Sequence, residues 1–358
     1  MKEVKRVFLI SDTHLGVRSN SKEWCDIIED YFQKFLIPLL KKESQPGDVL
    51  VHCGDVFDSR QSLNLYVLNL SISIFEEVSK ILPVYMLVGN HDIFMKHTND
   101  INSLKVFRNL KNVRVFEKPE KIQLGKKQAF FLPWVEDHKE LQDLIRQNSA
   151  DLLFCHADVS GFSFNKFTKI ESGPELKSFG GYHRVYSGHI HYAQKSGNVR
   201  MLGSPYELTR SDSGNTKSVW LYDLEKDEET EYVNTISPKF LRYKMEWVLE
   251  KSLDELQEIF FNNFIDISVS AEMSFYDHFS SLSEKLSGYR KLTHTLVDEV
   301  KVVEGDEVSN EEEISVQNLI EKYVESTSHS EGLKEKITQF SKKVYEEALK
   351  EIEERRTA

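Results

Sequence analysis

The N-terminal part of the sequence alternates unbroken apolar runs with segments of helical periodicity, and this order restricts the fold more than any other feature. The runs Val7–Ile10, Asp48–His52 and Val84–Val88 lack the alternation of a half-exposed strand, so we expect strands covered on both faces. Between them, Trp24–Leu40 and Leu63–Leu82 have helical spacing. This β-α-β-α-β order predicts a parallel sheet with right-handed crossovers.

Shorter strand-like runs follow, and they predict a second sheet facing the first. They are Val113–Phe116, Ala129–Pro133, Leu152–Cys155, Arg184–Ser187 and Ser218–Leu224. The polar stretch Glu225–Glu231 is expected to be a boundary, which gives a first domain at residues 1–225.

The remaining chain is expected to contain a small domain, a linker and a helical tail. Residues 236–304 have a second β-α-β-α-β pattern, with strands at Phe240–Val248, Phe264–Val269 and Leu292–Val303 and helices at Leu253–Phe261 and Phe275–Leu286. Residues 305–313 form an acidic linker. The tail, residues 314–358, carries two apolar stripes that include Leu319, Ile320, Tyr323, Leu333, Ile337, Phe340 and Val344. Two short helices cannot bury both stripes alone, so the tail is expected either to bind a partner or to fold back onto the small domain.

Composition leaves nucleic acid open as a ligand. The net charge is −12, but residues 1–220 carry +3 and residues 221–358 carry −15. The basic residues near the polar motifs could contact phosphates or be plain surface charge: Arg18, Arg60, Lys166, Lys169 and Arg210. No apolar run approaches the roughly 20 residues that span a bilayer. With three cysteines and no secretory leader, we expect a cytoplasmic protein that does not bind membranes.

Polar motifs follow five of the predicted strands. They are Asp12-Thr13-His14, Gly54-Asp55, Gly89-Asn90-His91-Asp92, His156 and Gly188-His189-Ile190-His191. Sites in open α/β sheets form outside the carboxyl ends of the strands, so these motifs can converge on one crevice. Each motif alone is common in ordinary turns, but all of them in this order point to a site.

The donor set predicts a pair of divalent metal ions. Two carboxylates, one amide oxygen and four imidazoles suit Mn, Fe or Zn better than Mg or Ca. They are too many for one structural zinc and fit two ions if Asp55 bridges them. Two such ions about 3.5–4 Å apart can clamp and hydrolyse a phosphate ester.

These motifs resemble those of the calcineurin-like metallophosphoesterase superfamily. Within it, the chain is similar to the SbcD-type nuclease subunits of double-strand-break repair, particularly the recombination endonuclease subunit of T-even phages. The supporting stretches are Ile10–Gly16, Gly54–Asp58, Val88–Asp92 and Gly203–Tyr206. The resemblance implies an α/β fold: a two-sheet sandwich flanked by helices, a small α+β capping domain and a helical tail that binds an SbcC-type coiled-coil ATPase. It also implies a homodimer, located in the host cytoplasm if phage-encoded.

The resemblance further assigns roles to the site residues. One ion would bind Asp12, His14, Asp55 and His191, and the other would bind Asp55, Asn90, His156 and His189. His91 would protonate the leaving oxygen, oriented by Asp92. Some relatives carry a histidine at the position of Asp58. This difference argues against a second histidine that helps to orient DNA in this chain.

The expected function is that of a manganese-dependent DNA nuclease in double-strand-break processing and recombination. It would act as a 3'-to-5' exonuclease on duplex ends and as an endonuclease on single strands. Two alternatives stay open: a phosphatase or cyclic-nucleotide phosphodiesterase with the same site, and a non-catalytic adaptor that binds DNA ends.

Overall fold

The computed structural model describes residues 3–166, 168–269, 273–296, 324, 332, 334 and 336–341. The chain divides into two compact units, Met1–Asp298 and Glu299–Ala358. In the second unit, residues 336–341 are helical, and they include the predicted stripe residues Ile337 and Phe340. The acidic linker and the other predicted stripe residues lie outside the described residues: Leu319, Ile320, Tyr323, Leu333 and Val344. In the described part of the chain, no helix is long and apolar enough to cross a membrane.

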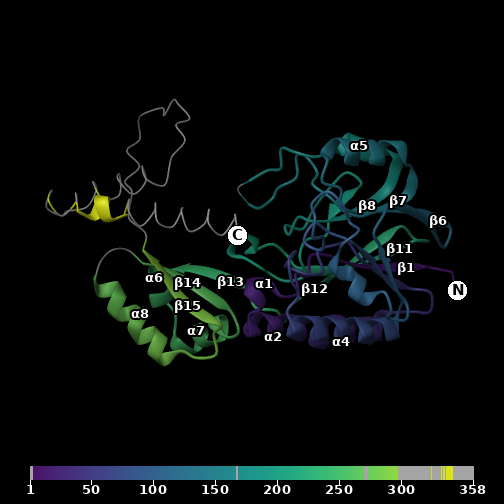
Figure 1. Ribbon diagram of the computed structural model, residues 1–358. Coiled ribbons are helices and arrows are strands. Elements are labelled where there is room, and N and C mark those ends of the chain that lie inside the picture. Colours follow the sequence, from purple (N-terminus) through teal and green to yellow (C-terminus); the bar gives the residue numbers. More distant parts are fainter. Residues whose placement is uncertain are drawn as a thin grey trace. The chain divides into compact units, whose positions relative to one another are not determined.

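The first sheet of unit one has six strands in the order β12-β11-β1-β2-β3-β4. Figure 1 labels three of them, β1, β11 and β12. Strands β1 to β4 pair in parallel, which confirms the predicted parallel sheet, and β11 adds antiparallel to β1. The bounds are β1 (Arg6–Ile10), β2 (Val49–His52), β3 (Val84–Leu87), β4 (Val113–Phe116), β11 (Ser218–Asp223) and β12 (Glu228–Val233).

The second sheet also has six strands, in the order β5-β6-β7-β8-β10-β9. Its bounds are β5 (Glu120–Leu124), β6 (Lys127–Leu132), β7 (Ala150–His156), β8 (Tyr182–Gly188), β9 (Gln194–Ser196) and β10 (Val199–Met201). The inner faces of the two sheets share one core, in which Val7 and Leu9 of β1 join Phe131 and Phe154 of the second sheet. The predicted two-sheet sandwich is therefore confirmed.

Helices cover the outer face of each sheet. Phe8 and Ile10 point outward from β1 into a core with α2 (Lys22–Tyr31), α3 (Ile37–Glu43) and α4 (Leu65–Ile81). Because β1 is buried on both faces, its sequence lacks alternation. Helix α5 (His138–Gln147), which was not predicted, covers the outer face of the second sheet.

A third sheet of three parallel strands follows, in the order β13-β14-β15, and confirms the predicted β-α-β-α-β unit. The bounds are β13 (Phe240–Lys244), α6 (Met245–Leu249), α7 (Leu253–Phe260), β14 (Phe264–Val269), α8 (Met273–Lys285) and β15 (Lys291–Leu296). The ring of Trp24 on α2 stacks on Phe264, with ring centroids 5.5 Å apart, and Phe264 stacks on Phe240 at 4.8 Å. These rings join the small sheet to the sandwich.

Two predicted boundaries are wrong. The strand predicted at 240–248 ends at Lys244, because Met245 and Val248 are buried three residues apart on one face of α6. The polar stretch expected as a boundary contains the start of β12, so the first sheet extends beyond residue 225. Of the third predicted strand, residues 297–303 lie outside the described residues.

The polar strand β12 is explained by its ion pairs with the second sheet. The carboxylate of Glu229 accepts hydrogen bonds from Arg200 on β10 at 2.7 Å, from Lys195 on β9 at 2.7 Å and from the hydroxyl of Tyr186 at 3.0 Å. The side chain of Glu229 is 11% exposed. Burial acts to raise its pKa, but Arg200 and Lys195 outweigh burial and lower the pKa to about 2. Glu229 therefore ties an edge of one sheet to the other.

We expect Glu229→Gln to lower the free energy of unfolding by about 2 kcal/mol at pH 7, the scale of hydrogen bonds to a charged group. The pKa in the folded protein is below the ordinary 4.5, so this stabilisation is complete above pH 4.5 and is lost as the pH falls through about 2. Urea denaturation of both proteins should give a smaller difference at pH 3 than at pH 7. The exposed Glu228→Gln is the control, and equal differences at both pH values would contradict the prediction.

Candidate metal centre

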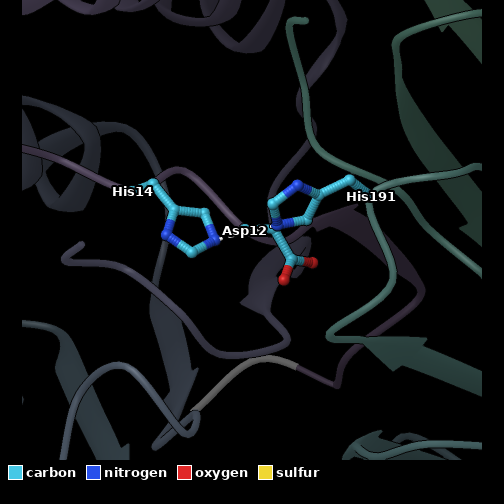
Figure 2. Close-up of side chains that lie close together, drawn as sticks. All are labelled: Asp12, His14 and His191. Atoms are coloured by element: carbon cyan, nitrogen blue, oxygen red, sulfur yellow. Dashed lines mark hydrogen bonds between the residues drawn. The ribbon is translucent and has the colours of Figure 1, made fainter. Parts of the chain in front are cut away.

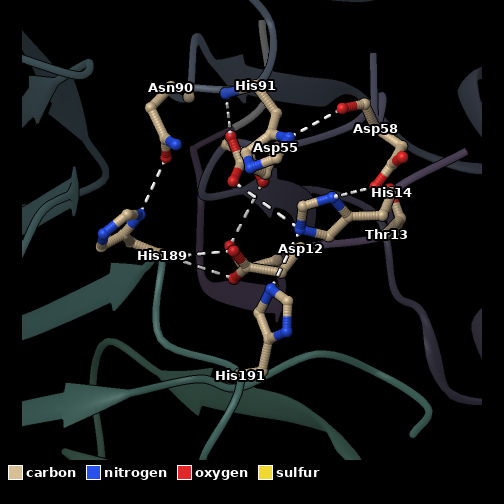
Figure 3. A network of polar contacts seen from close by, with 12 residues as sticks. Asp12, Thr13, His14, Asp55, Asp58, Asn90, His91, His189 and His191 are labelled. Carbon is tan, nitrogen blue, oxygen red and sulfur yellow. Dashed lines mark hydrogen bonds and ion pairs between the residues drawn. The ribbon is translucent and has the colours of Figure 1, made fainter. Parts of the chain in front are cut away.

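The predicted ligands come from loops at the carboxyl ends of both sheets and converge in one place (Figure 3). Three groups of donor atoms, each within 4.8 Å of one another, are formed by Asp12, His14 and His191, by His14, Asp55 and His91, and by Asp55, His156 and His189. Asn90 joins the third group, with its amide 2.8 Å from both His156 and His189. The structure thus brings all seven predicted ligands together.

The backbone of the ligand loops is held in an uncommon conformation. Four of the predicted ligands have a left-handed backbone: Asp12 (φ 55°), His14 (φ 42°), Asp55 (φ 54°) and His189 (φ 82°). Such angles are costly for residues other than glycine and persist only where surrounding contacts impose them. Here the amide of Asp12 donates to Gly54 O at 3.0 Å, and that of His14 donates to Asp55 O at 3.1 Å.

Two motif glycines are required because the ligands approach their backbone. A Cβ at Gly89 would lie 2.3 Å from Oδ1 of Asp55. A Cβ at Gly188 would lie 2.0 Å from Ser11 Oγ and 2.9 Å from Nδ1 of His156. A side chain at Gly89 would displace Asp55, and one at Gly188 would displace Ser11 and the Cys53 carbonyl and crowd the His156 ring.

The first ligand group contains two imidazoles that face each other (Figure 2). Nε2 of His14 lies 3.0 Å from Nε2 of His191, and Asp12 lies beside them. Oδ1 of Asp58 lies 3.2 Å from Nδ1 of His14, while Nε2 of the same ring faces His191 inside the site. Nitrogen lone pairs beside a buried carboxylate are a donor set that fits a divalent metal ion.

The third group, Asp55, His156 and His189 with Asn90, is built around Asp55. Oδ2 of Asp55 is 3.3 Å from Nε2 of His156 and 3.7 Å from Nε2 of His14, so this carboxylate lies between the two groups. The amide oxygen of Asn90 faces Nδ1 of His189 (Figure 3) and lies 2.8 Å from Nε2 of His156. In the other amide orientation, the nitrogen would donate to both imidazoles and the oxygen would accept from Arg60 at 2.9 Å. The orientation with oxygen toward the imidazoles suits a metal ion.

The charges in the cluster are strongly coupled. Burial acts to raise the pKa of Asp55, but the His156 and His14 imidazoles outweigh burial and lower it. Burial acts to lower the pKa of His156, but Asp55 and then Asp12 raise it to about 9. Burial raises the pKa of Asp12, and the charge of Asp55 raises it further. The His156 imidazole acts in the opposite direction but does not outweigh them. The Asp55 carboxylate and the His156 imidazole therefore stabilise each other's charged forms.

Three orienting groups were missed by the sequence analysis. Nδ1 of His156 lies 2.7 Å from the carbonyl oxygen of Cys53, and Nε2 of His189 lies 3.1 Å from Oδ1 of Asp158. The third is Asp58, beside His14. Only Asp158 had a sequence signal, since it follows His156 by two residues and so points to the same side of an extended chain.

The structure corrects the role predicted for Asp92. Nδ1 of His91 lies 2.7 Å from the carbonyl oxygen of Asp58, and this group orients the ring. The carboxylate of Asp92 instead accepts from the backbone amides of Gly89 at 2.9 Å, Phe57 at 3.0 Å and Val56 at 3.3 Å. Asp92 thus fastens the loop after β2 to the loop after β3.

Three of the five predicted DNA-contacting residues line one cleft of about 880 Å³ between the sandwich and the small sheet: Arg18, Lys166 and Arg210. Two further cations, Arg242 and Lys291, also line this cleft, together with two anions, Glu23 and Asp266. Asp266 is buried and lies 3.0 Å from Arg242 and 3.5 Å from Arg210. Of the other two, Arg60 lies beside Asn90, and Lys169 is exposed outside the cleft.

We expect Gly89→Ala to weaken Mn²⁺ binding and to lower the free energy of unfolding by about 1–3 kcal/mol, the usual cost of overpacking, because its Cβ displaces Asp55. Gly180→Ala is the matched control, since its Cβ would meet nothing within 4 Å. Chemical denaturation and isothermal titration with Mn²⁺ measure both effects. Unchanged Mn²⁺ binding in folded Gly89→Ala would contradict the assignment of Asp55 as a ligand.

Comparison with known proteins agrees with this geometry. A family model described as calcineurin-like phosphoesterase matches residues 5–260. Exonuclease subunit 1 of Enterobacteria phage T4 is 26% identical over 353 residues, which cover 96% of this chain and 99% of that protein. Candidate phosphoesterases of Invertebrate iridescent viruses 6 and 3 are 26% and 24% identical, over 53% and 65% of this chain and 66% and 67% of theirs. The resemblance noted from the motifs is thereby confirmed, and the chain belongs to the calcineurin-like phosphoesterase family.

Proposed function

We propose that this protein is a metal-dependent nuclease that hydrolyses phosphodiester bonds of DNA. The observation that carries the proposal is the convergence of two carboxylates, four imidazoles and one amide, with His91 beside them. The relative in phage T4 is named as an exonuclease subunit and matches almost the whole chain, which supports a nucleic acid as the substrate. A 3'-to-5' action on duplex ends and an endonuclease action on single strands, in double-strand-break processing and recombination, are part of this proposal.

The residues divide into two metal-holding groups that share one carboxylate. Asp12, His14, Asp55 and His191 would hold one ion, and Asp55, Asn90, His156 and His189 would hold the other. Bound divalent ions, with manganese expected, polarise the phosphate and lower the pKa of water. The ring partners Asp58, Cys53 O and Asp158 keep the imidazole lone pairs directed inward.

His91 is placed to move a proton. Its Nδ1 donates to Asp58 O, so Nε2 is the nitrogen that can exchange a proton with the substrate. Burial lowers the pKa of His91, despite the opposing charge of Asp55. A phosphodiester anion beside the ring favours the imidazolium, which can then donate its Nε2 proton to the leaving oxygen.

We expect purified protein to release a 3' label from linear duplex DNA in Mn²⁺ and not in chelator. His91→Ala should cut about 10²–10⁴-fold more slowly, the usual contribution of a general acid, while still binding Mn²⁺. The exposed His97→Ala is the control for loss of a histidine. Hydrolysis of a small phosphodiester without cleavage of DNA, even with a cognate ATPase present, would favour the phosphodiesterase alternative. Metal binding without hydrolysis of any ester would favour the adaptor.

The basic cleft supplies a path for the DNA backbone. Two chain segments connect this cleft with the metal centre. In the first, Arg18 follows the predicted ligand His14 by four residues. In the second, Arg210 follows Tyr206 by four residues, and the Tyr206 hydroxyl donates to Thr13 O beside His14. Cations from the sandwich and from the small sheet face this cleft. We propose that residues 236–304 act as a capping domain that completes the DNA site.

We expect Arg18→Gln with Lys166→Gln to weaken DNA binding and to reduce the slope of log K against log salt by about 1 for each phosphate that the variant no longer neutralises. The exposed Lys126→Gln, in the turn between β5 and β6, is the matched control. Fluorescence anisotropy with a labelled duplex in Ca²⁺ over a salt series measures the slope. An unchanged slope would place the DNA elsewhere.

The assembly is also a proposal. We infer that the tail, residues 314–358, binds an SbcC-type coiled-coil ATPase, and Phe340, which is 70% exposed, offers an apolar contact. We propose a homodimer through α4, where Leu65 is 75% exposed and Tyr66 is 44% exposed. The three cysteines are free and buried, which supports a reducing compartment such as the cytoplasm.

A further inference from the structure

Lys217, just before β11, is buried in a way that simple packing does not explain. Its side chain is 6% exposed, and burying an ammonium is costly unless its protons are taken up. Nζ lies 2.7 Å from the carbonyl oxygen of His191, 3.0 Å from Ser204 Oγ and 3.5 Å from Asp212 Oδ1. The shortest contact is therefore to the main chain of a predicted metal ligand and not to the counterion.

Asp212 does not by itself account for the position of Lys217. Its Oδ2 accepts from the amides of Thr209 at 2.8 Å and Leu208 at 3.0 Å, so this carboxylate is engaged in the turn at 209–212. A lysine that served only as its counterion would need no contact with His191. Instead the ammonium extends past Asp212 to the loop after β8.

His191 needs such support more than the other predicted imidazole ligands. Nδ1 of His156 and Nε2 of His189 each have an orienting partner on the ring nitrogen that faces away from the site, and Nδ1 of His14 has the Asp58 carboxylate 3.2 Å away. Within the described residues, the only polar contact of the His191 ring is with His14, inside the site. Its orientation therefore depends on the position of its own backbone.

That backbone is fixed from the segment that carries Lys217. Oδ1 of Asn215 accepts from the amide of Ala193 at 2.8 Å, and Nδ2 of Asn215 donates to Ala193 O at 3.1 Å. Lys217 donates to His191 O at 2.7 Å, and this carbonyl oxygen also accepts from the amide of Ser204 at 3.3 Å. Two side chains, two residues apart, thus hold both ends of the turn at 191–193.

We propose that Lys217 is a positioning residue that fixes the main chain of His191 and so maintains the metal site formed by Asp12, His14 and His191. Lys217 positions His191 through a contact with its backbone carbonyl. Asp58 and Asp158 instead contact the imidazole rings of His14 and His189. The inference rests on the proposed metal centre and adds to it a residue that touches no metal, substrate or reacting atom.

The test is a titration of the full chain with Mn²⁺. Isothermal calorimetry measures the binding, and the electron paramagnetic resonance signal of free Mn²⁺ counts the bound ions. Wild-type protein should bind two ions. Lys217→Met, which keeps the length of the side chain and removes the ammonium, should keep one ion and bind the other about ten- to a hundredfold more weakly, the usual effect of removing an orienting partner. Lys226→Met, whose side chain is 70% exposed, is the matched control and should bind both ions normally.

A second variant identifies which ion is weakened. Asp158→Asn removes the charge beside His189 and should weaken the other ion, so the double variant with Lys217→Met should weaken both. Lys217→Gln keeps one donor for His191 O and should bind the weakened ion more tightly than Lys217→Met. It decides the question if the methionine variant does not fold.

The outcomes separate the two proposals. Wild-type protein that does not bind two Mn²⁺ ions would overturn the metal centre itself. Two normally bound ions in folded Lys217→Met, or in folded Lys217→Gln where the methionine variant does not fold, would overturn the role of Lys217 and leave the metal centre intact. Equal weakening of both ions in the variant would also overturn it, because a general loss of structure would then explain the effect.

Discussion

The carboxylate of Asp55 is the contact on which the arrangement of the site depends. One oxygen accepts from the amide of His91 at 2.8 Å, and the other faces His156 and His14. This single group thereby touches the loops after β1 and β3 and the end of β7, which belongs to the other sheet. Its negative charge lies between imidazoles that come from both sheets, so this one group links the two halves of the site.

Much of the fold and of the site could be predicted because local signals carried them. Unalternating strands between helices specify a parallel sheet, and polar residues after each strand must then meet at one edge. The orienting groups could not be found in this way. The carbonyl oxygens of Cys53 and Asp58 act through the backbone, which has no residue signature, and Lys217 reaches His191 only through the tertiary fold.

The error at β12 has the same origin. Strand β12 is polar because its partners, Arg200 and Lys195, come from the opposite sheet, and a local pattern cannot show that pairing. The orienting role expected of Asp92 came from the family resemblance and not from a local pattern. The Asp92 carboxylate turns instead to three backbone amides, which only the closed fold brings within reach.

The left-handed backbone at Asp12, His14, Asp55 and His189 has a consequence for any mutational dissection of this protein. Alanine at these positions removes a donor and also retains an unfavourable φ, so its effect mixes chemistry with conformational strain. Asparagine tolerates the left-handed region better than most residues and is close in shape to aspartate. Substituting Asn at Asp12 and Asp55 would therefore isolate the contribution of charge, whereas an alanine scan would overstate it.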